Sequence, residues 1–200
     1  MYQYSDMSPQ EREEIILIRK SRGYPLHAPP HPFRGEGYYF ISAANYQHAF
    51  ILNSNQRRTG FEMDLFNMLK EMNADLFGWV ILPNHYHFLA KISDLNLLSQ
   101  QLKLLHGRNS YIWNKEDGMT NKRKVWYHFS DRMIRNERHY YSTLNYIHHN
   151  PVKHHLCERA DDWMWSSIHL YLKDFGREWV IKNWYNYKPG EKFGKGWDDL

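Results

Sequence analysis

Two histidines one residue apart stand in an apolar, strand-like run near the middle of the chain. His85 and His87 lie within residues 78–92, which read GWVILPNHYHFLAKI. Because side chains alternate across a strand, both imidazoles should point to the same face of a sheet. Two imidazoles on one face can bind a metal ion, but an HxH pair on a strand can equally be two hydrogen-bonded histidines. The spacing alone leaves both interpretations open.

A tyrosine and an asparagine four residues apart form the second chemical pattern. Tyr146 and Asn150 occur in the segment NYIHHNPVKHHL, residues 145–156. On a helix, residues four apart share a face, so a phenolic nucleophile and an amide oxygen ligand could sit side by side. His149 competes with Asn150 as the third ligand, and Pro151 could place Asn150 at the helix end. The plainer interpretation is a core aromatic followed by a turn.

The elements that would position these residues follow from the apolar periodicity. Strands are predicted at residues 37–46, 76–82, 85–92 and 124–134, and helices around residues 61–72, 95–105 and 137–150. This order of strands and helices indicates an α+β chain with a ferredoxin-like antiparallel sheet and helices on one face. The helix that carries Tyr146 should follow the last strand directly.

The composition is that of one globular unit with a basic surface. Of the 200 residues, 42% are apolar and 16% are aromatic, which is enough to bury a core. Because Cys157 is the one cysteine, an intrachain disulfide is excluded and a reducing compartment is expected. The apolar runs are far too short to span a bilayer, so we expect a soluble, cytoplasmic protein. A pI near 9.0 favours a polyanionic partner.

Basic residues surround the segment that carries Tyr146. Candidates for phosphate contacts are Arg132, Arg135, Arg138 and Lys153, and, more distant in sequence, Lys122, Arg123 and Lys124. Each of them alone could simply hydrate a helix or a loop, because most surface charges do no more than that. As a cluster around a candidate nucleophile they favour DNA, whose phosphates Lys and Arg neutralise.

Together these motifs resemble the REP-associated tyrosine transposases, which lie within the single-tyrosine HUH transposases. The resemblance extends from about Gly37 to Leu172. It is carried by the strand GYYFISAANY, the signature LPNHYH, the segment VWYHFSDRMIRNERHYYSTLNYIHHNPVKHHL and the trailing WMWSSIHLYL. It is the combination of these motifs, rather than any one of them, that is specific.

The resemblance assigns roles to the residues that match the family's motifs. It implies that His85 and His87 bind a divalent metal, that Tyr146 is the nucleophile and that Asn150 is a polar third ligand. It also implies a ferredoxin-like fold and binding of single-stranded DNA hairpins from repetitive extragenic palindromes. Two imidazoles and one amide oxygen leave coordination positions for a phosphate, and Mg²⁺ or Mn²⁺ is the expected ion. Relatives include monomers and dimers, so a homodimer is allowed.

The predicted function is metal-dependent cleavage and strand transfer of single-stranded DNA in DNA transposition, by an HUH-type nickase and strand transferase. Attack by Tyr146 would expel a 3′-hydroxyl and leave a 5′-phosphotyrosine, so strand transfer would need no ATP. One alternative is a domesticated DNA-hairpin binding protein without turnover. Another is a metal-dependent nuclease that uses water, for which Tyr146 would be dispensable.

Three segments are expected along the chain. Residues 1–36 should form an N-terminal arm and a proline-rich connector, with a helix that starts at Ser8 and Pro9. Residues 37–172 should form the HUH transposase-like catalytic domain. Residues 173–200 should form a Trp-rich C-terminal extension, whose role the sequence leaves open.

Overall fold

The computed structural model describes residues 35–120, 123–190 and 193, together with single positions at 8, 10, 14 and 17. The N-terminal arm expected at residues 1–36, including the predicted helix, lies almost entirely outside the described residues. Most of the chain after residue 190 lies outside them as well. Within the described ranges, no helix is both long enough and apolar enough to cross a lipid bilayer.

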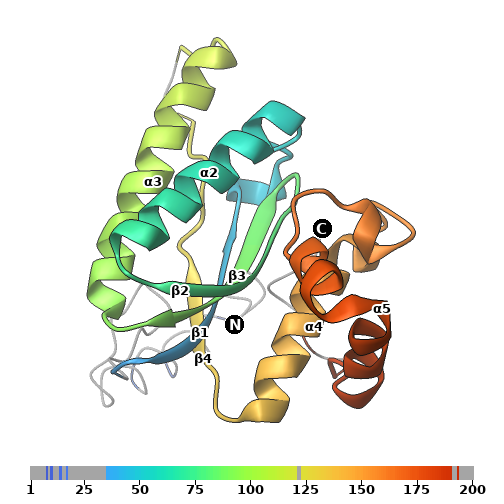
Figure 1. Cartoon of the computed structure of the whole chain (residues 1–200). Coiled ribbons are helices and arrows are strands. Elements are labelled where there is room, and N and C mark those ends of the chain that lie inside the picture. The colour runs from blue at the N-terminus through green and yellow to red at the C-terminus, as the bar shows by residue number, and fades with distance from the viewer. Residues whose placement is uncertain are drawn as a thin grey trace.

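A four-stranded antiparallel sheet forms the centre of the chain, with its strands in the order β2-β3-β1-β4 (Figure 1). The strands are β1 (Gly37–Ala44), β2 (Asp75–Ile81), β3 (His85–Ile92) and β4 (Ser130–Met133). The helices are α2 (Asn55–Glu71), α3 (Leu95–Glu116), α4 (Glu137–Lys153) and α5 (Ile168–Asn186), with short 3-10 helices η1 (Tyr46–His48) and η2 (Ala160–Asp162). The chain order β1-α2-β2-β3-α3-β4 with this strand arrangement is ferredoxin-like, which confirms the predicted α+β class.

The strand predicted at residues 124–134 is shorter in the structure. Strand β4 covers Ser130–Met133 and pairs with β1, whereas the preceding residues touch β1's continuation through an isolated bridge between Asn45 and Trp126. The physical reason is the partner strand, because β1 ends at Ala44 and the chain turns into η1. Residues 124–129 therefore have no extended partner with which to form a ladder.

Helices α2 and α3 cover one face of the sheet (Figure 1). Side chains from β1 and β3 interlock there with apolar side chains of the two helices. This core includes Tyr39, Ile41, Phe61, Leu65, Tyr86, Phe88, Ala90, Ile92, Leu98 and Leu102. The β3 residues in this core alternate along the strand with His85 and His87. The two histidines therefore point to the other face of the sheet.

Helix α4 covers the opposite face of the sheet, which carries the two histidines. Leu89 of β3 packs there with Leu144 and Ile147 of α4. Both faces of β3 are therefore buried. As a result, His85 and His87 lie in an interior layer between the sheet and α4 rather than on an open surface.

Polar N-caps fix where the helices begin. Ser54 accepts a hydrogen bond from a backbone N–H in the first turn of α2, and Asp94 accepts two in α3. Asn136 accepts the N–H of His139 at 2.8 Å and starts α4 directly after β4. Such caps satisfy N–H groups that have no partner inside the helix. The cap of α4 thus sets the register at which its later residues reach the sheet.

A glycine in β2 lets α4 approach the sheet closely. A Cβ atom added to Gly78 would lie 2.7 Å from Cδ1 of Leu144, which is fully buried. The same atom would lie 3.5 Å from Oγ of Ser167, which also accepts the backbone N–H of Trp79. Gly78 also marks a register shift in the pairing of β2 with β3. The absence of a side chain here allows the contact between helix and strand.

Helix α5 packs on the outer side of α4. The amide of Asn183 donates to Oδ1 of Asn145 at 2.8 Å, and the amide of Asn145 donates back to the carbonyl of Asn183 at 3.0 Å. The helix is kinked at Gly176, whose φ is 81°. It runs across residue 172, so the boundary expected between catalytic domain and extension falls inside a helix.

A mostly buried histidine, His106, lies on the face of the sheet that α2 and α3 cover. Its burial makes the stability of the fold depend on pH. His106 stacks on Trp126 at 4.3 Å, and its Nε2 lies 2.9 Å from Oη of Tyr86. Burial lowers the pKa of His106 from about 6.5 to about 3. Between these values the unfolded chain binds a proton that the folded chain does not. The stabilisation is therefore complete above pH 6.5 and is lost as the pH falls toward 3.

We expect Gly78→Ala to lower the free energy of unfolding by about 1–3 kcal/mol, because the added methyl meets buried Leu144. The matched control is Gly60→Ala in α2, where a Cβ meets nothing within 4 Å. That change should stabilise the helix by about 0.5–1 kcal/mol. Urea unfolding of both variants measures the difference. Equal effects of the two substitutions would contradict the close approach at Gly78.

We expect His106→Gln to remove up to about 1.4 kcal/mol per pH unit from the slope of unfolding free energy against pH below 6.5. The glutamine does not titrate, so its folded and unfolded forms bind protons equally at this position. The control is His128→Gln, since His128 is exposed. Urea unfolding between pH 7 and pH 4.5 provides the slope. An unchanged slope in His106→Gln would show that this histidine is protonated in the folded protein.

Candidate active site

The two histidines of the HxH pair lie side by side, as the strand alternation predicts. The ring centroids of His85 and His87 are 5.0 Å apart, and both side chains are buried beneath α4. They project from β3 near the end of β1, where Ser42 pairs with His87 and Ala44 pairs with His85. The strand geometry therefore delivers two imidazoles to one enclosed position.

Two residues that the sequence analysis missed orient these imidazoles. Oγ of Ser42 lies 2.7 Å from Nδ1 of His87, and Oδ1 of Asn84 lies 2.6 Å from Nδ1 of His85. The amide nitrogen of Asn84 donates to the carbonyl of His48 at 3.1 Å, so its oxygen must be the atom that faces His85. Nδ1 of His85 then carries the proton, and Nε2 presents a lone pair.

The side chain of Asn150 lies next to this Nε2 nitrogen. Its Oδ1 lies 3.1 Å from Nε2 of His85, and the residue is completely buried. Helix α4 continues through Pro151 to Lys153, so Asn150 lies within the helix and not at its end. In the tautomer with the proton on Nδ1 both of these atoms are acceptors, and a cation between them would bind both. Octahedral ligands at about 2.1 Å place neighbouring donors about 3 Å apart, which fits this pair.

The competing histidine, His149, lies elsewhere. Its ring packs 4.4 Å from the ring of Trp184 on α5. Another histidine that the sequence did not single out, His154, lies 5.0 Å from His85 between ring centroids. Burial, followed by electrostatic repulsion between His154 and His85 when both are protonated, lowers the pKa of His154 to about 3, so His154 is neutral at pH 7. Among the described residues, no three His, Cys, Asp or Glu side chains converge, so a metal here would need the amide of Asn150.

Tyr146 lies in the same layer, one helical turn before Asn150. Its ring centroid is 5.5 Å from His87, and its side chain is only 4% exposed. Nζ of Lys153 lies 3.4 Å from its hydroxyl and donates to it. The ring of Phe193 lies 4.5 Å away on the tyrosine. A single chain thus brings the histidines, the amide and the phenol together.

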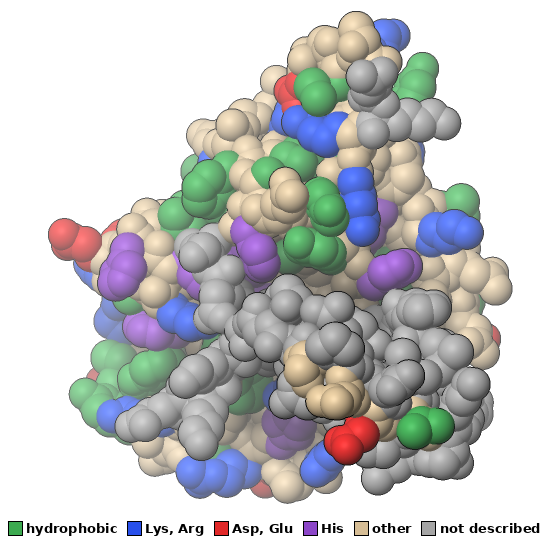
Figure 2. Space-filling view, turned by 180° about the vertical axis from the view of Figure 1, so that it is seen from behind, with side chains coloured by type: hydrophobic (Ala, Val, Ile, Leu, Met, Phe, Trp, Pro, Cys, Tyr) green, Lys and Arg blue, Asp and Glu red, His purple; other side chains and the backbone are tan. Residues whose placement is uncertain are grey.

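The predicted basic residues divide into two groups. Lys153 contacts Tyr146, and the guanidinium of Arg132 on β4 lies 5.9 Å from the ring of Phe193. Arg135 and Arg138 are exposed at the start of α4, more than two turns before Tyr146. On the face seen from behind, Lys, Arg and His side chains lie among hydrophobic ones (Figure 2). The first group lies at the candidate site, and the second group lies at the exposed N-terminal end of α4, away from Tyr146 in the helix.

The basic candidates that are more distant in sequence differ from one another in their surroundings. Arg123 is engaged in hydrogen bonds with Asn114 and an ion pair with Asp117. Lys124 is exposed, and its ammonium lies 4.5 Å from the ring centroid of Tyr46. Lys122 lies outside the described residues. Lys124 is therefore the one described member of this group whose charge faces solvent next to an aromatic ring.

Comparison with known proteins identifies sequence relatives. No protein-family model matches the chain. A Haemophilus influenzae protein, provisionally named as a REP-associated tyrosine transposase, is 28% identical over 111 residues, which cover 48% of this chain and 63% of that protein. The REP-associated tyrosine transposase of Escherichia coli K12 is 25% identical over 133 residues, or 60% of this chain and 74% of that protein. The chain thus covers less than two thirds of the first relative's length.

A solved structure supplies the corresponding fold. The structure of a REP-associated tyrosine transposase bound to a REP hairpin has a TM-score of 0.60 and 18% sequence identity, over 75% of this chain and 87% of that chain. At this identity the likeness establishes the fold. The two sequence relatives and the shared fold confirm that this chain resembles the REP-associated tyrosine transposases.

Proposed function

We propose that the protein cleaves single-stranded DNA at REP-like hairpins and transfers the strand through a phosphotyrosine at Tyr146. The observation that carries this proposal is the meeting of His85, Asn150 and Tyr146 in one buried layer of one chain. The REP-hairpin complex of the structural neighbour supports the choice of substrate. All of these residues come from one chain, which supports a site that needs no residue from a second protomer. The homodimer and the cytoplasmic location stay predictions.

The donor set suits a hard divalent cation. His85, His87 and Asn150 would hold Mg²⁺ or Mn²⁺ through two imidazole nitrogens and one amide oxygen. When bound, such an ion supplies positive charge that orients a phosphate and stabilises the charge that develops on it. Ser42 and Asn84 keep the imidazole lone pairs directed at this position.

The chain's own residues then account for the transfer. The Tyr146 oxygen forms a bond to phosphorus, the bond from phosphorus to the 3′-oxygen breaks, and the proton that the phenol loses is matched by the proton that the 3′-oxygen takes up. The 3′-oxygen leaves as a hydroxyl, and the 5′-phosphate stays on the tyrosine. The Lys153 ammonium, 3.4 Å from the phenolic oxygen, would stabilise the negative charge that develops on that oxygen as its proton leaves.

The alternative with a specific observation in its favour is a hairpin-binding protein without turnover. Tyr146 is 4% exposed, and Phe193 packs on its ring. A phosphate can reach the hydroxyl only if this covering is displaced. A nuclease that activates water differs from both, because it forms no protein–DNA bond.

We expect purified protein with Mn²⁺ and a labelled single-stranded hairpin to form a protein–DNA adduct that survives denaturation, and Tyr146→Phe to abolish it. The control is Tyr141→Phe on the same helix, whose ring packs against Tyr187 rather than the histidines. It should keep the adduct. Denaturing gels measure all three proteins. Cleavage without an adduct would identify a nuclease, and binding without cleavage would identify a binding protein.

We expect Ser42→Ala to weaken Mn²⁺ binding by about 10- to 100-fold, because the substitution removes the partner of His87 Nδ1. His87→Ala should abolish binding at this site. Ser110→Ala is the matched control, since the hydroxyl of Ser110 donates to the carbonyl of His106 within α3. Titration followed by electron paramagnetic resonance of free Mn²⁺ gives the affinities without any need for activity. Wild-type affinity in His87→Ala would refute the proposed ligand set.

A further inference from the structure

An aromatic pair, one ring partly buried and the other exposed, lies where β1 ends. The rings of Tyr46 and Tyr127 are 5.0 Å apart between centroids, at an angle of 51°. The Lys124 ammonium lies 4.5 Å from the first ring and 5.5 Å from the second. Tyr127 is 37% exposed, and His48 lies 6.0 Å from it. We call Tyr46, Tyr127 and Lys124 the aromatic platform.

The platform lies beside the candidate site. Tyr46 follows Ala44 by two residues, and Ala44 pairs with His85. Asn84 connects the two places directly, because its amide donates to the carbonyl of His48 and its oxygen accepts from His85. One side chain therefore separates the platform loop from a proposed metal ligand.

The loop that carries Tyr46 is held in an unusual conformation. Gln47 and His48 have φ values of 55° and 52°, in the left-handed region that residues with side chains rarely adopt. The backbone N–H of Tyr46 donates to the carbonyl of Val125 at 2.8 Å, and the amide of Asn45 donates to the same carbonyl at 3.2 Å. Such conformations persist where the surroundings enforce them, and they cluster at binding sites.

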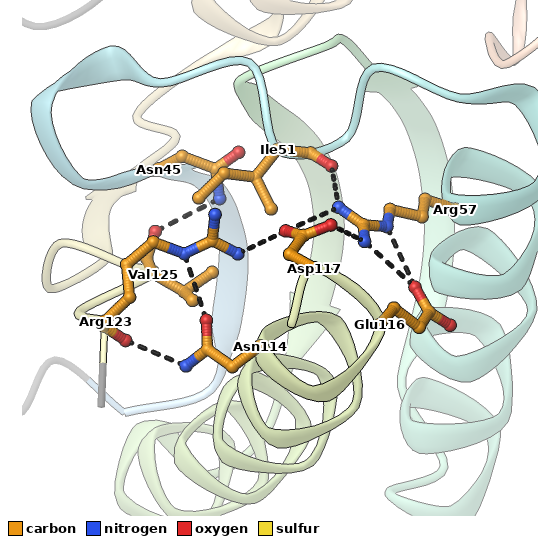
Figure 3. A network of polar contacts seen from close by, with 8 residues as sticks. All are labelled: Asn45, Ile51, Arg57, Asn114, Glu116, Asp117, Arg123 and Val125. Carbon is orange, nitrogen blue, oxygen red and sulfur yellow. Dashed lines mark hydrogen bonds and ion pairs between the residues drawn. The ribbon is translucent and has the colours of Figure 1, made fainter. Parts of the chain in front are cut away.

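A polar network fastens both sides of the platform to the end of α3 (Figure 3). Asp117 accepts from Arg57 at 2.5 Å and from Arg123 at 2.7 Å. Arg57 also donates to the carbonyl of Ile51 in the loop after η1, and Asn114 donates to the carbonyl of Arg123. The loop with Tyr46 and the segment with Tyr127 are thus tied to one carboxylate.

This arrangement differs from ordinary core packing. A tyrosine pair that served only the core would be buried, as Tyr39 and Tyr86 are at 0% exposure. Here the neighbouring Trp126 fills the core beneath α2, while Tyr127 remains open to solvent with a lysine over it. Exposed rings with an adjacent cation are the components that bind single-stranded DNA, because bases stack on the rings and the ammonium contacts phosphate.

We infer that the aromatic platform binds an unpaired nucleobase of the strand whose phosphate lies at His85 and His87. This inference rests on the proposed function and names a binding position beyond the catalytic set. Stacking on an aromatic side chain tolerates different bases, so the platform holds the flanking strand rather than reading its sequence. Its fixed loop positions the backbone next to the histidines.

The test compares two fluorescently labelled DNA hairpins, one with single-stranded flanks and one blunt, in binding assays without metal. Tyr127→Leu should weaken binding of the flanked hairpin about tenfold and leave the blunt hairpin unchanged. Tyr127→Phe keeps the ring and should bind like the native protein. Tyr111→Leu, at an exposed tyrosine on α3, is the matched control. Thermal unfolding of each variant confirms that it is folded.

The outcomes separate the platform from the proposed function. Lys124→Gln should lower the slope of log affinity against log salt by about 0.7 for the flanked hairpin, as expected for one phosphate contact to a single strand. If native protein binds the flanked hairpin and Tyr127→Leu binds it equally well, the platform is refuted while the proposed function stands. If native protein binds neither hairpin, the proposed function fails and the inference fails with it.

Discussion

The contact of α4 with the sheet is the constraint on which the candidate site depends. Leu144 packs over Gly78, and a side chain on that glycine would collide with it. Because a helix behaves as a rigid body, this one contact sets the height and rotation of everything that follows on α4. Tyr146 and Asn150, four residues apart, are then delivered together to the face of His85 and His87. The candidate site therefore forms where α4 packs on the sheet.

The cost of this arrangement is a layer of buried polar groups. His85, His87 and Asn150 are each exposed by 4% or less, and an unsatisfied polar group in such a place destabilises the fold. The partners of the histidines, Ser42 and Asn84, meet part of this requirement from β1 and the turn before β3. The remaining contact, between Nε2 of His85 and Oδ1 of Asn150 at 3.1 Å, joins the imidazole of β3 to the amide of α4. The proposed cation would bind at this contact.

Sequence periodicity predicted the parts of this site that local geometry controls. The span of β3 followed from alternation, and the shared face of Tyr146 and Asn150 followed from helical spacing. Spacing could not show where His149 and Asn150 each point, because the place of His149 depends on Trp184, which lies on α5, 35 residues later in the sequence. Pro151 suggested a helix end, yet α4 continues through it to Lys153, without the backbone hydrogen bond that a proline cannot donate.

The roles of Ser42 and Asn84 required the tertiary structure, and Asn84 shows why. In the sequence it marked only a bend after proline. In the fold its amide makes two hydrogen bonds of opposite sense, as donor to the loop carbonyl of His48 and as acceptor from His85. Neither bond can be exchanged for the other without breaking both, so the orientation of the amide is fixed. Asn84 therefore links the loop of His48 to His85 through one side chain, so a displacement of that loop also displaces the hydrogen bond that orients the imidazole.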